Sequence, residues 1–246
     1  MTPALLSGRE VVIATDLDGT ILGGSAAERA HLYRWIVRER HRVGLVFVTG
    51  RSLESVRPLL DDPDIPDPDL VIGDVGASIA SGDLTPIEAL EAQVRGRWPG
   101  REAVLAHLAD LDDLEVQAVP QRNRVSYLAR APATVAAVRV RAAALGLDVC
   151  YSCDRYLDVL PAGVDKGRAL EVVLEGFEVD RARVLVCGDT LNDLSLYGLG
   201  LAGVVVGEAE PALVEATADR PHVFHATAPG AGGIAQALAR LMGEQL

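Results

Sequence analysis

Two carboxylates, Asp16 and Asp18, stand two positions apart directly after a run of apolar and small residues, in the stretch VVIATDLDGTIL. Side chains two positions apart on an extended chain point to the same side. Like charges held that close repel each other unless something neutralises them. The pair is therefore either an ordinary solvated turn at the end of a strand or a place that holds a cation and does chemistry.

Polar side chains also follow the ends of two other apolar segments. The segment RVGLVFVTG leads into Thr49, and the later segment ARVLVCGD ends in Asp189. If these segments are parallel strands, their carboxyl ends meet at one edge of the sheet, where ligands bind in such sheets. We therefore expect a single crevice to collect residues that are far apart in the sequence. They are Asp16, Asp18, Thr49, Gly50, Arg51, Lys166, Asp189, Asn192 and Asp193.

These residue types are the parts needed for phosphoryl transfer from a phosphate ester. One carboxylate can attack phosphorus and form an aspartyl-phosphate. A second carboxylate can protonate the leaving alcohol and then activate water. A hydroxyl, backbone N–H groups and a lysine can bind the phosphoryl oxygens. Clustered carboxylates with oxygen-only ligation suit Mg²⁺, which also removes the repulsion between the paired acids.

The motifs DLDGT, a strand-ending Thr49, an isolated Lys166 and GDTLND, in this order, resemble the signature motifs of the haloacid dehalogenase (HAD) superfamily of phosphatases. Each one alone also fits an ordinary turn, strand end, helix cap or surface lysine. The ordered set, which spans the whole chain, favours a phosphatase active site.

The resemblance implies a role for each motif residue. It implies Asp16 as nucleophile and Asp18 as general acid and base, with Thr49 and Lys166 binding phosphate. The metal ligands that it implies for Mg²⁺ are Asp16, the main-chain carbonyl of Asp18, Asp189 and Asp193. The candidates for phosphate and substrate contact are Gly19, Gly50, Arg51, Asn192, Asp74, Ser78, Arg122, Arg124 and Tyr156.

Short apolar runs alternate with helical patterns over residues 1–82 and again over 161–246. Strand–helix alternation with almost continuously apolar strands is typical of a parallel sheet covered on both faces. We therefore predict an α/β fold with a Rossmann-like, doubly wound parallel-sheet core. Between the two halves, residues 83–160 change to a helix–hairpin–helix–hairpin rhythm, which predicts an inserted α+β domain.

The place and pattern of this insert resemble the αββαββ cap of the Cof-type (IIB) subgroup of the HAD superfamily. Closer similarity, in FVTGRS, GDVGASI, PAGVDKGRAL and GDTLNDLSLY, is to phosphatases of phosphorylated glycosides of the sucrose-phosphate and glucosylglycerol-phosphate kind. The resemblance implies a small-molecule phosphate ester as substrate. It also implies functional pairing with a glycosyltransferase that makes the ester.

Other functions stay open at this point. The substrate alternative is a cyclitol or sugar intermediate of natural-product biosynthesis, such as a trehalose-like or validoxylamine-like phosphate. A phosphomutase is a second possible enzyme class. A sugar-phosphate sensor is the hypothesis in which the protein is not an enzyme. The leading hypothesis is a Mg²⁺-dependent sugar-phosphate phosphatase, and the intact motif set argues against the sensor.

Net charge, apolar stretches and cysteine content indicate which binding partners and which cell compartment to expect. The chain has 246 residues and a formal charge of −12, which argues against nucleic acid and anionic membrane surfaces as partners. No signal-peptide pattern begins the chain and no apolar stretch is long enough to cross a membrane, so we expect a cytoplasmic protein. Three cysteines are too few for a disulfide framework.

Overall fold

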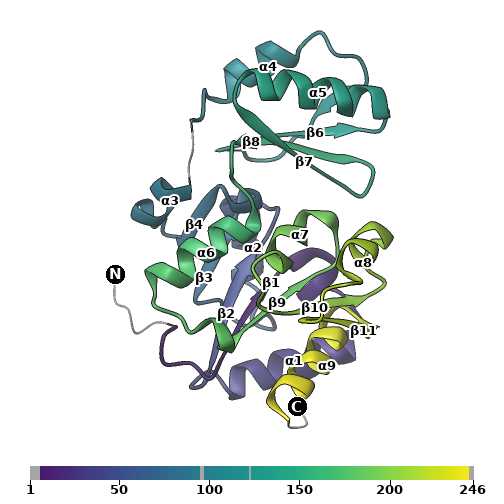
Figure 1. Cartoon of the computed structure of the whole chain (residues 1–246). Coiled ribbons are helices and arrows are strands. Elements are labelled where there is room, and N and C mark those ends of the chain that lie inside the picture. Colours follow the sequence, from purple (N-terminus) through teal and green to yellow (C-terminus); the bar gives the residue numbers. More distant parts are fainter. Residues whose placement is uncertain (1–5, 95–96, 122, 244–246) are drawn as a thin grey trace.

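Two β-sheets organise the chain, one above the other, in a computed structural model that describes residues 6–94, 97–121 and 123–243 (Figure 1). The larger sheet has seven strands and lies in the part of the molecule that contains both termini. The smaller sheet has four strands and belongs to the segment inserted in the middle of the sequence. The α/β fold class predicted from the sequence is confirmed.

The main sheet is parallel except at one edge. Its strands, in spatial order, are β11 (Val223–Pro229), β10 (Ala202–Gly207), β9 (Val184–Gly188), β1 (Val11–Thr15), β2 (Val43–Val48), β3 (Leu70–Gly73) and β4 (Ser78–Ser81). Every residue of β1 and β2 is buried, as expected for strands covered on both faces. The sequence analysis missed β4, which follows β3 through a tight turn and pairs with it antiparallel.

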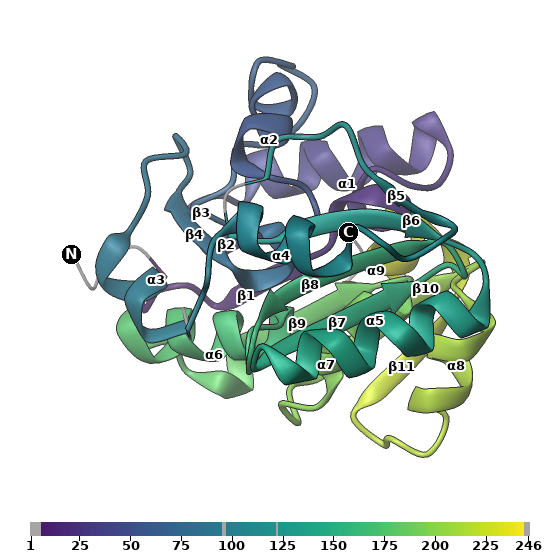
Figure 2. The same cartoon turned by 90° about the horizontal axis from the view of Figure 1, so that it is seen from above.

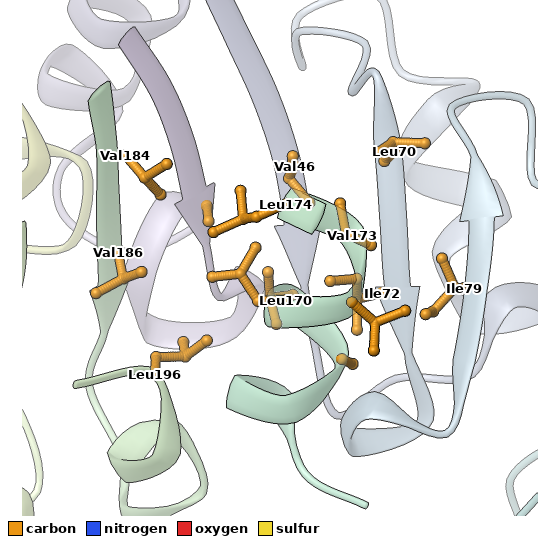
Figure 3. Close-up of a cluster of buried hydrophobic side chains, with 14 of the residues drawn as sticks. Val46, Leu70, Ile72, Ile79, Leu170, Val173, Leu174, Val184, Val186 and Leu196 are labelled. Carbon is orange, nitrogen blue, oxygen red and sulfur yellow. The ribbon is translucent and has the colours of Figure 1, made fainter. Parts of the chain in front are cut away.

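Helices cover both faces of the main sheet. One face packs against α3 (Glu88–Val94), α6 (Lys166–Gly176), α7 (Leu194–Tyr197) and α8 (Pro211–Thr217). The other face packs against α1 (Ala26–Arg38), α2 (Leu53–Leu60) and α9 (Gly230–Met242). Helix α1 follows the N-cap Ser25, whose side chain forms a capping box with Glu28. Figure 3 shows Leu170, Val173 and Leu174 of α6 among strand residues such as Val46 and Ile72.

The inserted segment folds over residues 101–161 into a cap with its own core. Its elements are α4 (Arg101–Leu108), β5 (Leu114–Val116), β6 (Val125–Ala129), α5 (Pro132–Ala144), β7 (Leu147–Ser152) and β8 (Tyr156–Pro161). This is the predicted αββαββ pattern. The sheet order is β5-β6-β8-β7, entirely antiparallel. Figure 2 shows α4 and α5 on the outer side of this sheet, away from the main sheet.

The beginning of the insert belongs to the core rather than to the cap. The sequence analysis placed the boundary at residue 83, but α3 packs against α6 and β4. Its residues Leu90 and Val94 are buried in the same cluster as the main-sheet strands. Helical periodicity in a sequence does not say which of two cores the apolar face of a helix such as α3 meets.

None of the helices in the described ranges combines the length and the apolar character that crossing a bilayer requires.

The replacement Leu170→Ala tests the packing of α6 on the sheet. Leu170 is fully buried, so its truncation leaves a cavity and should lower the free energy of unfolding by about 2–5 kcal/mol in urea denaturation. Val140→Ala on α5 is the control, because that side chain is 72% exposed and its loss should change stability by no more than about 0.5 kcal/mol. Equal effects of the two replacements would contradict this packing.

Candidate active site

Three neighbouring strands of the main sheet deliver the predicted chemical groups to one place. Asp16 directly follows β1, Thr49 follows β2 and Asp189 follows β9. These strands lie side by side in the order β9-β1-β2, with β1 in the centre. Their carboxyl ends therefore bring residues from both halves of the core together, as parallel strands in an α/β sheet do.

A completely buried lysine connects these groups. The Nζ atom of Lys166, the first residue of α6, donates to Asp16 Oδ1 at 2.7 Å, to Asn192 Oδ1 at 2.7 Å and to Asp193 Oδ1 at 2.6 Å. Burial lowers the pKa of the lysine, but Asp16 and Asp193 outweigh that effect, so its pKa lies above the ordinary value. Lys166 is therefore a permanent cation whose three protons are all directed at site oxygens.

Asp16 is a carboxyl group that this cation does not fully compensate. Desolvation by burial, opposed by Lys166 and reinforced by Asp193 and Asp189, raises the pKa of Asp16 to about 8. A carboxyl group must be ionised to attack phosphorus, and a cation beside Asp16 would favour its ionised form.

Asp189 lies beside Asp16 and Asp193, in close contact with Gly19. Its Oδ1 accepts from Thr20 Oγ1 at 2.6 Å, and burial is the main cause that raises its pKa to about 6. A Cβ atom on Gly19 would lie 2.2 Å from Asp189 Oδ2, and Gly19 has a φ of +79°. The glycine of DLDGT is thus needed for space and for backbone conformation, and only glycine meets both needs here.

The carboxylates fit a hard divalent cation such as Mg²⁺. Oxygens of Asp16, Asp189 and Asp193 lie within 4.8 Å of one another. Among the described residues, Oδ2 of Asp16 and Oδ2 of Asp189 accept no hydrogen bond from a protein donor, and such oxygens are the ligands that Mg²⁺ prefers.

Asp193 is held by three protein donors. Its Oδ1 accepts from Lys166, and its Oδ2 accepts from the backbone N–H groups of Asp189 at 3.0 Å and Thr190 at 3.1 Å. These bonds anchor the lysine and shape the acidic loop, residues 189–193. Because a carboxylate oxygen can accept a hydrogen bond and still bind a cation, Asp193 stays a predicted metal ligand.

Asp18 lies at the edge of the site with its side chain 61% exposed. Arg51 holds it with two parallel hydrogen bonds, from Nε to Oδ2 at 2.8 Å and from Nη2 to Oδ1 at 2.5 Å. The hydrogen bond to Asp18 also raises the pKa of Arg51. An exposed ion pair contributes little to stability, so this pair mainly orients the Asp18 carboxylate. The nearby Thr49 is buried, and its Oγ1 accepts from the Arg51 backbone N–H at 3.1 Å.

A cavity of 490 Å³ lies between the core and the cap at this point. Its core side includes Asp16, Asp18, Gly50, Arg51 and Asn192. Its cap side includes Gln117, Arg124, Cys153, Tyr156 and Asp158. The sequence analysis did not single out Gln117 or Asp158 as site residues. Each is one polar residue in or beside a short strand, and only the pairing of the cap sheet turns it toward the core.

Asp74 and Ser78, expected to contact substrate, line a separate and smaller cavity of 140 Å³. Both side chains are buried, and Ser78 Oγ donates to Asp74 Oδ2 at 2.7 Å. Arg124 of the cap donates to Asp74 Oδ1 at 3.0 Å and to Asp158 Oδ1 at 2.7 Å. Burial is the main cause of the raised pKa of Asp74, and Arg124 opposes it. Asp74 and Ser78 therefore join the cap to the core instead of lining the main cavity.

The remaining predicted contacts divide between the cavity and the rest of the chain. Arg124 and Tyr156 both line the main cavity. The Tyr156 ring is 41% exposed, and the guanidinium of Arg155 lies 5.6 Å from its centre. Arg122 lies outside the described residues.

The α/β core, the inserted αββαββ cap and the motif residues gathered around Lys166 define a sugar-phosphate phosphatase of the HAD superfamily. Comparison with known families gives the narrower group. Residues 9–241 match the model of sucrose-6F-phosphate phosphohydrolase. The chain belongs to this family of phosphoric monoester hydrolases.

Similar proteins carry related names. Glucosylglycerol-phosphate synthase of Pseudomonas anguilliseptica is 46% identical over 229 residues, which are 92% of this chain and 30% of that protein. Mannosylfructose-phosphate phosphatase of Agrobacterium fabrum is 31% identical over 92% of this chain and 95% of its own length. The crystal structure of the sucrose-phosphatase from Synechocystis sp. PCC6803, solved with sucrose and phosphate, has a TM-score of 0.85 at 23% identity and covers 95% of this chain and 98% of that one.

Removing the buried cation tests the network around Lys166. Lys166→Met keeps the volume of the side chain but leaves Asp16 and Asp193 buried without it, so the free energy of unfolding should fall by about 3–5 kcal/mol. The measurement is guanidinium denaturation followed by circular dichroism. Arg168→Met is the matched control, because Arg168 lies two residues further along α6 with an exposed side chain. This replacement should leave stability nearly unchanged. A Lys166→Met protein as stable as the control would contradict the network.

Proposed function

We propose that this protein is a Mg²⁺-dependent phosphatase that hydrolyses a phosphorylated glycoside through an aspartyl-phosphate. The observation that carries the proposal is the position of Asp16. Its carboxyl group is held by Lys166 and opens into the cavity that Asp18 borders on the core side and the cap borders on the other. A nucleophile, a proton carrier and a space for the leaving group thus lie together.

The reaction begins when an oxygen of Asp16 attacks phosphorus and the bond from phosphorus to the sugar oxygen breaks. Asp18, which must be protonated for this step, donates its proton to the departing alcohol, and an aspartyl-phosphate remains on Asp16. Asp18, now ionised, takes a proton from water as that water attacks phosphorus. The second displacement releases inorganic phosphate and restores the Asp16 carboxylate.

The other residues of the site act on charge and orientation. Lys166 offsets negative charge on Asp16 and on the phosphoryl group, and Arg51 keeps Asp18 aimed at the cavity. Asp16, Asp189 and Asp193, with the main-chain carbonyl of Asp18, would hold Mg²⁺, which would supply positive charge beside the Asp16 carboxylate and the phosphoryl group. The Thr49 hydroxyl and the Gly50 backbone N–H group are the proposed contacts to the phosphoryl oxygens.

We further propose glucosylglycerol-phosphate as the leading substrate, with sucrose-6-phosphate as the next. The 46% identity to part of a glucosylglycerol-phosphate synthase is the main support. The cap wall of the cavity supports a polyhydroxylated leaving group, because Gln117, Arg124 and Asp158 supply donors and acceptors and Tyr156 supplies a ring face. The same relative supports a functional pairing with a glycosyltransferase.

Phosphate release from a panel of esters tests this function. The panel contains glucosylglycerol-phosphate, sucrose-6-phosphate, trehalose-6-phosphate and simple hexose phosphates, each with Mg²⁺ and with chelator. We expect strong release from one glycoside phosphate, none in chelator, and none from Asp16→Asn, which keeps the fold. Wild-type protein that releases no phosphate from any ester in Mg²⁺ would overturn the proposal. A fully active Asp16→Asn variant would exclude Asp16 as the nucleophile.

Replacement of Arg51 tests the orientation of Asp18. Arg51→Leu removes both hydrogen bonds to Asp18, so kcat should fall by roughly 10-fold or more, and by no more than the roughly 10²–10⁴-fold that general acid–base catalysis contributes in full. The control is Arg57→Leu on α2, which removes the same charge outside the main cavity. Steady-state kinetics on the preferred ester distinguish the two. Equal kcat values would show that Asp18 needs no such partner.

A further inference from the structure

The turn that joins β7 and β8 of the cap rests on the acidic loop of the core. Residues of β7 contact the short helical turn Leu191–Asp193, which lies inside that loop. Cys150 of β7 packs against the buried apolar cluster of the core, which Leu191 and Leu194 also contact. The cap therefore meets the segment that carries Asp189, and the two are 30 or more residues apart in sequence.

A carboxylate outside the signature motifs connects the two segments. Glu210 Oε1 accepts from the Cys153 backbone N–H at 3.2 Å, and Glu210 Oε2 accepts from the Leu191 backbone N–H at 2.7 Å. The backbone N–H of Glu210 donates to the Asp189 carbonyl at 2.7 Å. Glu210 thus makes two hydrogen bonds with the acidic loop and one with the turn between β7 and β8, residues 153–155, called the cap turn below.

These contacts are not those of an ordinary helix cap. Glu210 precedes α8, yet its side chain makes no hydrogen bond to that helix. Both of its oxygens instead accept N–H groups of other segments, and hydrogen bonds to an ionised acceptor are stronger than neutral ones. The cap turn, residues 153–155, holds Cys153 and Asp154 at positive φ values of 51° and 46°, as tight β-hairpin turns often do.

We infer that Glu210 is a positioning residue that latches the cap turn onto the acidic loop. When the turn is seated, Cys153 forms part of the wall of the main cavity and the same carboxylate holds Leu191, next to Asn192 and Asp193. The position of the cap turn and the position of the acidic loop, which bonds to Lys166, therefore both depend on the Glu210 side chain. This inference rests on the proposed function only for its effect on turnover.

Hydrogen–deuterium exchange on the full-length protein tests the latch without any activity measurement. In Glu210→Ala, the amides of Cys153 and Leu191 lose their acceptor and should exchange at least 10-fold faster. Glu210→Gln keeps one acceptor oxygen, so it should protect one of the two amides only. Exchange of the Ile13 amide in β1 reports global unfolding and should stay unchanged in every variant.

Glu208→Gln is the matched control, because it removes the same charge from an exposed side chain two positions away. It should leave the exchange of both amides as in the wild type. If Glu210→Ala also leaves both amides unchanged, the latch does not exist in solution. If only the Leu191 amide is affected, Glu210 organises the loop but does not hold the cap, and the inference is wrong.

Kinetics then separate positioning from a purely structural role. On the preferred glycoside phosphate, Glu210→Ala should raise KM and lower kcat several-fold each, with the melting temperature unchanged, and Glu210→Gln should fall between it and the wild type. Unchanged kinetics together with faster exchange would overturn the coupling to catalysis. A wild-type protein without phosphatase activity would instead refute the proposed function, while the exchange data would still decide the latch.

Discussion

The buried ammonium group of Lys166 is the interaction on which the site depends. It lies among Asp16, Asn192 and Asp193, and without it the carboxylates of Asp16 and Asp193 would be buried with no cation from the protein beside them. The position of α6 makes this possible. A Cβ atom on Gly167 would lie 2.4 Å from the Ser195 carbonyl oxygen, and one on Gly76 would lie 2.3 Å from the Asp165 carbonyl oxygen. Two glycines therefore let the helix start close enough to deliver the amine.

The cap is joined to the core on two sides of the cavity by contacts of different character. On one side the buried Arg124 links Asp74 of the core to Asp158 of the cap, and breaking such a pair is costly because an uncompensated charge stays buried. On the other side Glu210 accepts a single backbone N–H of the cap turn. This asymmetry places the stronger connection at Arg124 and the weaker one at the turn beside the acidic loop.

Local patterns were sufficient where one rule decides the outcome. Continuous apolar runs predicted the buried strands β1, β2 and β9. They were insufficient where two partners compete for the same element. The apolar face of α3 suits either core, and only packing against α6 assigns it to the larger one. Strand β4 was missed because its four residues follow β3 through a turn too short to separate them by pattern.

The sequence by itself determined the chemical groups and the edge of the sheet at which they meet, because residues at the ends of parallel strands converge whatever the details of packing. Only the tertiary structure decided how those groups are used. In the folded protein Asp74, with Ser78 bonded to it, connects the core to Arg124 of the cap. Both oxygens of Asp193 accept hydrogen bonds from protein donors. The tertiary structure also brought Glu210 to Cys153, because contacts between segments distant in sequence depend on packing geometry that no local pattern records.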